Sequence, residues 1–116
     1  MGAEPFQSLR SLYYGKRAAD RKEEILDAIR SRKMLPGLYL ITFASNGIDQ
    51  LDILPCYAVL QKHVRESHPV LAGVCLGRQE AFETVAEMAA DAYRTTGACH
   101  LQTFLLGREK QGGAGA

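Results

Sequence analysis

Hydrophobic residues recur with helical spacing in the first third of the chain. Ala18, Ile25 and Ile29 form a narrow apolar stripe within residues 16–33, where acidic residues lie towards the start and basic residues crowd the end. This order of charges suits the helix dipole. Pro36-Gly37 stops the pattern, so the sequence predicts a first helix over residues 16–33.

The next apolar segments predict a β-hairpin. Leu38–Ala44 is rich in β-branched and aromatic residues, which is typical of a strand. Asn46-Gly47 follows between two apolar runs, and this pair favours a hairpin turn over a loop that leads into a helix. A turn there pairs Leu40 with Ile53 and makes a core face of Leu38, Leu40, Leu51 and Ile53. The opposite face then carries Tyr39, Ile41, Phe43, Ile48 and Leu54.

The middle of the chain predicts a second helix and a buried strand. Apolar residues recur at helical spacing from Cys56 to about Ser67, and Pro69 disfavours helical geometry at the residue before it. Val70–Leu76 is apolar throughout, without alternation. Such a run is typical of a strand that is covered on both faces, in the middle of an α/β sheet.

The last third of the chain predicts one more helix and a final strand. The helix spans about residues 78–96, Gly97 is placed to end it as a left-handed cap, and Cys99–Leu106 follows as a strand. The inner stripe of this helix is expected to be Phe82, Val85, Ala86, Ala89 and Tyr93. The acidic row on the opposite side, expected to face solvent, is Glu80, Glu83, Glu87 and Asp91.

These elements predict an α/β fold in the order α-β-β-α-β-α-β. Helices join the three later strands, so we expect those strands to be parallel, in a mixed four-stranded sheet with helices packed on it. Residues 16–108 form the single α/β domain. Residues 1–15 are expected to be a partly ordered leader, unless Tyr13 and Tyr14 dock on the domain, and residues 109–116 a flexible Gly/Ala tail.

Composition limits the classes of function. A chain of 116 residues suits one domain, and a net charge of +1 creates no overall field to attract nucleic acid or an acidic membrane. Three cysteines are an odd number without close pairs, and the N-terminal segment has no apolar secretion signal. No apolar run is long enough to span a bilayer. We therefore expect a cytoplasmic protein with free thiols.

The candidate ligand site lies where the strands lead into helices. In open α/β sheets, ligands bind beyond the carboxyl ends of parallel strands, and free N–H groups at a helix N-terminus favour an anion. The residues predicted at these ends are Cys56, Tyr57, Cys75, Gly77 and Arg78. The alternative is that Gly77 only makes a tight turn and that Arg78 is solvated.

Other groupings of reactive residues indicate less. Cys56, His63, His68 and Cys75 lack the close ligand pairs of a structural zinc site, so we expect no metal and no cofactor. Cys99 and His100 are neighbours on the expected strand, where their side chains point to opposite faces. The basic group at Arg30, Arg32 and Lys33 is a favourable helix end without a nucleic-acid motif. Asp49 and Asp52, with Glu66, are explained as solvated charges.

These observations rank three classes of function. No set of nucleophile, base and orienting group stands out, so the sequence leans away from an enzyme and towards a non-catalytic accessory protein. Such a protein acts through homo-oligomerisation, expected as a homodimer, or through contact with another protein. The alternative is a protein or minor enzyme that binds an anionic metabolite at the site named above. Nucleic-acid binding through residues 16–33 ranks third, and no membrane partner is expected.

Overall fold

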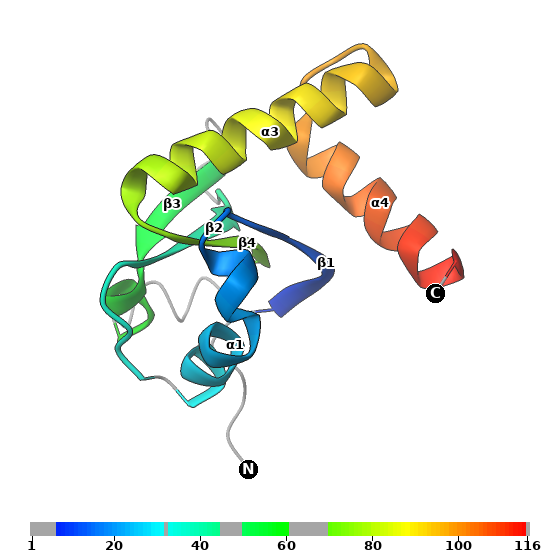
Figure 1. The fold of residues 1–116 in the computed structure, drawn as a ribbon. Helices are drawn as coiled ribbons and strands as arrows, with labels where there is room; N and C mark the ends of the chain where they lie inside the picture. Colours follow the sequence, from blue (N-terminus) through cyan, green and yellow to red (C-terminus); the bar gives the residue numbers. More distant parts are fainter. Residues whose placement is uncertain (1–6, 32, 45–49, 61–69, 116) are drawn as a thin grey trace.

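The computed structural model describes residues 7–31, 33–44, 50–60 and 70–115. The strands are β1 (Gln7–Tyr14), β2 (Leu38–Phe43), β3 (Leu51–Pro55) and β4 (Val70–Leu76). The α-helices are α1 (Lys22–Ser31), α3 (Arg78–Thr96) and α4 (Leu101–Gly115), and short 3₁₀ turns span Ala18–Arg21 (η1) and Cys56–Leu60 (η2). Figure 1 shows α1 and α3 on opposite sides of the sheet. The predicted α/β class is confirmed.

The four strands form one mixed sheet in the order β1-β4-β2-β3. β4 pairs parallel with β1 and antiparallel with β2, and β2 pairs antiparallel with β3. β4 therefore lies inside the sheet, as its continuous apolar run predicts, and every residue from Leu71 to Leu76 is buried. β3 and β4 run in the same direction, as predicted, because β2 runs opposite to both. They are not neighbours in the sheet, since β2 lies between them.

Each face of the sheet has its own hydrophobic cluster. On one face, Ile25 and Ile29 of α1 pack with Leu40 and Val74. On the other face, Met88 of α3 and Leu105 of α4 join Ile41 and other sheet residues. Two covered faces give this short chain a core on both sides of a single sheet, which is how α/β domains bury apolar surface.

The start of the chain contributes a strand that the sequence analysis does not predict. β1 supplies the fourth strand of the sheet and pairs parallel with β4. Leu9 and Tyr13 are buried, so the condition that the tyrosines dock on the domain is met for Tyr13. Leu9 and Tyr13 belong to the same hydrophobic cluster, although the β1 register is irregular between Ser8 and Tyr13.

The hairpin is confirmed, but its predicted register is wrong by one residue. Leu40 lies opposite Leu54 rather than Ile53, so Ile53 and Leu51 face the α3 side with Ile41. The physical reason is the length of the connection: the backbone N–H of Ala44 donates to the carbonyl of Gln50 at 3.0 Å, which leaves five residues between them. A two-residue turn at Asn46-Gly47 would instead place Leu40 opposite Ile53. Asn46 and Gly47 themselves lie outside the described residues.

The first helix begins later than predicted, since η1 precedes α1. Only the start of the expected second helix is described, as η2, and residues 61–69 lie outside the described part of the chain. No helix in the described ranges is long and apolar enough to cross a membrane.

α3 matches its predicted range, but its buried face is rotated from the predicted one. The buried residues are Glu80, Ala81, Thr84, Met88 and Ala92, whereas Phe82 and Tyr93 are 51% and 63% exposed. The face of α3 that carries Ala81 and Ala92 is buried in place of the face that carries Phe82 and Tyr93, because small side chains allow the helix to lie close to the sheet. Gly97 ends the helix as predicted, with φ +78° and its N–H bonded to the Tyr93 carbonyl at 2.8 Å.

The predicted last strand, Cys99–Leu106, is wrong. Leu101 begins α4, which packs on β1 and α3, and the backbone of residues 109–115 continues this helix. The side chains that point into the core follow the helical spacing i, i+3 and i+4: Leu101, Phe104 and Leu105. The chain thus ends on two consecutive helices, and Figure 1 shows α3 and α4 meeting at an angle beyond Gly97.

Candidate functional site

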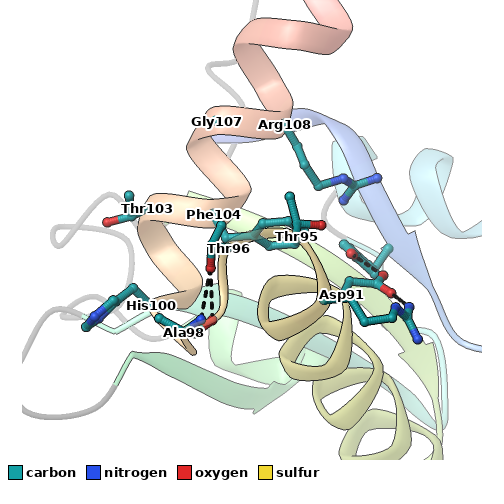
Figure 2. A pocket seen from close by; sticks show the side chains of 11 residues that line it. Asp91, Thr95, Thr96, Ala98, His100, Thr103, Phe104, Gly107 and Arg108 are labelled. Atoms are coloured by element: carbon teal, nitrogen blue, oxygen red, sulfur yellow. Dashed lines mark hydrogen bonds and ion pairs between the residues drawn. The ribbon is translucent and has the colours of Figure 1, made fainter.

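A crevice of about 600 Å³ lies where the end of α3, the start of α4 and β1 meet. Its size falls within the range of about 300–1,000 Å³ that is usual for small-molecule sites. Figure 2 shows Phe104 and Thr95 in the middle of this group and His100 towards the opposite end from Arg108. The complete lining is Tyr13, Asp91, Arg94, Thr95, Thr96, Ala98, His100, Thr103, Phe104, Gly107 and Arg108.

Local structure at the α3–α4 corner shapes this crevice. Gly97 ends α3 in a left-handed conformation, which a residue with a side chain adopts at a cost. The Thr96 hydroxyl donates to the Ala92 carbonyl at 2.8 Å and accepts from the Ala98 N–H at 3.2 Å. These bonds join the end of α3 to the connection that follows it, and the apolar side chains of α4 hold that helix on the sheet.

Asp91 is the centre of a polar group at one side of the crevice. Tyr13 donates a hydrogen bond from its hydroxyl to Asp91 Oδ2 at 2.7 Å, and the Arg94 guanidinium pairs with Asp91 Oδ1. Burial, together with the hydrogen bond to Asp91, raises the pKa of Tyr13 to about 12. Tyr13 is therefore a neutral hydrogen-bond donor at physiological pH, and Arg94 neutralises the charge of Asp91.

Arg108 is a second cation in the crevice, and its charge has no such counterpart. Its guanidinium lies over the Tyr13 ring, 4.5 Å from the ring centroid, which is the geometry of a cation–π contact. No carboxylate of the described residues pairs with it, and its Nη1 is buried without a hydrogen-bond partner there. The crevice therefore holds two guanidinium groups and one carboxylate, an arrangement that attracts an anion.

The structure divides the residues predicted as a ligand site between two hollows and the buried core. Tyr57 and Arg78 line a hollow of about 520 Å³ beside β3, together with Phe82. Gly77 lines a different hollow with Arg17 and Arg21. The two hollows share no lining residue, and neither is lined by the predicted cysteines.

Both predicted cysteines of that site are buried and hydrogen bonded. The Cys56 thiol donates to the Leu35 carbonyl at 3.3 Å, and the Cys75 thiol donates to the Thr84 hydroxyl at 3.3 Å. Burial raises the pKa of the Cys75 thiol, so little of the reactive thiolate form is present at neutral pH. Cys56 and Cys75 therefore fill the core as small apolar residues.

The start of α3, where the sequence predicts an anion contact, holds a carboxylate of the chain itself, Glu80, which is bonded to N–H groups outside that helix. Glu80 Oε2 accepts from the Leu76 N–H at 2.7 Å and from the Ala18 N–H at 3.3 Å. Glu80 Oε1 accepts from the Arg17 N–H at 2.9 Å and from Arg17 Nε at 3.3 Å. Burial by itself raises the pKa of Glu80, but these hydrogen bonds outweigh it and hold that pKa below its usual value. The expectation that Glu80 faces solvent is wrong, since it is 5% exposed.

The other groupings of reactive residues show no cluster of metal ligands in the described part of the chain. Cys99 is exposed and lies with His100 in the connection before α4, so the argument from strand alternation does not apply to this pair. Within the described ranges no three His, Cys, Asp or Glu side chains gather as metal ligands. Five residues from the other groupings lie outside those ranges: Arg32, Asp49, His63, Glu66 and His68.

Sequence reasoning missed the residues of the crevice because it assigned a strand to the start of α4. A helical pattern is present there, since Leu101, Phe104, Leu105 and Arg108 follow the spacing i, i+3, i+4 and i+7. That pattern places Phe104 and Arg108 one turn apart on one face. No local signal connects them with Tyr13 or Asp91.

Comparison with known proteins adds no assignment to this geometry: no protein-family model matches the chain, and no significant match was found among curated proteins or solved structures.

Proposed function

We propose that this protein binds a small anionic molecule, bearing a carboxylate or phosphate group, in the crevice between α3 and α4. The state of Arg108 carries this proposal. Its charge has no carboxylate partner in the described chain, and its Nη1 is buried without an acceptor. A buried donor without a partner costs about 1–3 kcal/mol, and more when it is charged. An anion in the crevice offsets this cost if the Arg108 guanidinium turns towards the anion and donates a hydrogen bond to it.

The remaining lining indicates what else the ligand carries. Phe104 is mostly buried in the core, at 8% exposed, and the remaining part of it lines the crevice, whereas Thr95 and Thr103 are exposed and carry hydroxyl groups. Arg94 adds a second guanidinium, which is 71% exposed and already paired with Asp91. A metabolite with one anionic group and a small apolar or ring portion fits this lining better than a bare inorganic ion, because the apolar wall then also contributes.

A thermal-shift screen with carboxylates, phosphate monoesters and nucleotides tests the proposal. A ligand at a hundredfold excess over its Kd stabilises the folded state by about 2.7 kcal/mol. In a domain of this size that raises Tm by roughly 10 °C. Arg108→Gln should abolish the rise. Arg30→Gln, which removes an exposed cation of α1 outside the crevice, should retain it.

Two results contradict the proposal. The first is that no anion raises Tm beyond the effect of sodium chloride at equal ionic strength. The second is a rise in Tm that is as large in Arg108→Gln as in the unaltered protein, because binding then occurs elsewhere.

The second candidate function is an accessory protein that acts through self-association. The outer edge of β3 favours it, because no strand of the described residues pairs with this edge and such an edge is a template for another strand.

A further inference from the structure

β3 is an end strand of the sheet, and no strand of the described chain pairs with its outer edge. Edge strands present free N–H and C=O groups, and proteins usually protect or use them. The question of what pairs with this edge is independent of the crevice, which lies beside β1 at the other end of the sheet order.

The register shows which backbone groups of β3 face outward. Ala44 and Gln50 continue the β2–β3 register by one pair, and the Ala44 N–H donates to the Gln50 carbonyl. Hydrogen-bonded pairs alternate along an antiparallel ladder. Asp52 and Leu54 therefore direct their backbone groups towards β2. The residues between them direct theirs outward: Leu51, Ile53 and Pro55.

This outward edge is complementary to itself. If two β3 strands pair antiparallel about Ile53, each Ile53 N–H donates to the Ile53 carbonyl of the other copy. Each Leu51 N–H then donates to the Pro55 carbonyl of the other copy. Pro55 has no N–H, and at this outward position it takes no bond away from the β2 ladder. Every outward N–H of β3 thus gains an acceptor in one two-fold arrangement.

Exposed aromatic side chains lie beside this edge. The hollow next to β3 is lined by Ile53 and Pro55, and also by Tyr57 and Phe82, which are 53% and 51% exposed. Aromatic residues are the side chains that contribute most at protein interfaces. A second copy paired on β3 brings its own Tyr57 and Phe82 to the same place, so apolar contact accompanies the strand pairing.

We propose that two copies of this chain associate through antiparallel pairing of their β3 strands, centred on Ile53, to form a continuous eight-stranded sheet. The test combines sedimentation equilibrium with hydrogen exchange. The 12.7 kDa chain should reach twice that mass at high micromolar concentration. Phe82→Glu should remain monomeric, whereas Tyr93→Glu, at another exposed aromatic position on the same helix, should still dimerise.

Hydrogen exchange then identifies the surface. The amides of Leu51 and Ile53 should be protected only at concentrations where the dimer forms, whereas Asp52 and Leu54 should be protected at all concentrations. The proposal is overturned by a monomer at every concentration, or by a dimer in which Leu51 and Ile53 still exchange rapidly. Protection of Leu51 and Ile53 in the monomer would also overturn it, since the edge is then covered within one chain.

Discussion

The backbone N–H of Arg17 donates to Glu80 Oε1 at 2.9 Å, although 63 residues separate the two along the chain. The same carboxylate accepts from Leu76 and Ala18, so it joins the turn after β1 to the start of α3. Arg17 also donates from its guanidinium to the Leu76 carbonyl. A carboxylate of the chain itself thus lies at the start of α3, close to where the sequence predicts an external anion, and it is bound by N–H groups that precede the helix.

Glu80→Gln should destabilise the fold at neutral pH by about 1–3 kcal/mol, because an amide nitrogen replaces one acceptor and leaves a buried N–H without a partner. Urea unfolding measures the difference. The control is Glu83→Gln, which alters an exposed carboxylate on the same helix and should change stability little. Equal effects of the two changes would show that the Glu80 bonds contribute nothing specific.

The stabilising effect of Glu80 should depend on pH. Its pKa is lowered in the folded state, so its contribution is fully present above the ordinary value of 4.5 and is lost as pH falls through the lower folded-state value. The stability difference between the unaltered protein and Glu80→Gln should therefore shrink below pH 4.5. A difference that stays constant as pH falls contradicts this account.

Gly15→Ala should be costly because of Glu80. A Cβ at Gly15 overlaps the Glu80 carboxylate, which is fixed by its hydrogen bonds. In a Glu80→Ala background the same change should cost less or even stabilise slightly, since alanine restricts the unfolded chain. A double-mutant cycle should give a coupling of about 1 kcal/mol or more. Simple additivity of the two changes would refute the steric explanation.

Tyr13→Phe should reduce stability by about 1 kcal/mol at neutral pH, because it removes the hydrogen bond to Asp91. The folded-state pKa of Tyr13 is raised to about 12, so its contribution is fully present below the ordinary value of 10 and is lost as pH rises through about 12. Between these two pH values, the free energy of unfolding should fall less steeply with pH in Tyr13→Phe than in the unaltered protein. Tyr93→Phe, at an exposed position, serves as the control.

The three cysteines should react with iodoacetamide at very different rates. Cys99 is exposed, whereas Cys56 and Cys75 are buried. Intact-mass measurement of the native protein should show one rapid adduct, located at Cys99 by peptide mapping. The other two should react only on unfolding. Rapid alkylation of Cys75 in the native protein would contradict its place in the core.

Local signals in the sequence were sufficient for parts of the fold. The uninterrupted apolar run of β4 predicts a covered strand, and Gly97 predicts the end of α3, because both features depend on neighbouring residues alone. The predicted hairpin register was wrong because the register depends on the length of the connecting loop. A change of one residue in that length moves every side chain of the strand to the other face.

Contacts between distant segments explain the rest. The hydrogen bonds from Arg17 and Ala18 to Glu80 leave no periodic pattern in the sequence. The pattern of acidic residues on α3 therefore does not distinguish the buried Glu80 from the carboxylates that face solvent. The apolar residues at the start of α4 suit a short strand as well as a helix, and packing against β1 decides between them. Because the crevice depends on that packing, its residues were not predicted.

The most direct test of the central claim is an NMR titration of the protein with the anion that raises Tm most. Binding in the crevice predicts that the Arg108 Nε–Hε signal and the backbone amides near Thr95, Thr96 and Thr103 shift together and saturate with one Kd. Shifts confined to Gly77 and Arg78, with the Arg108 signal unchanged, would contradict the claim.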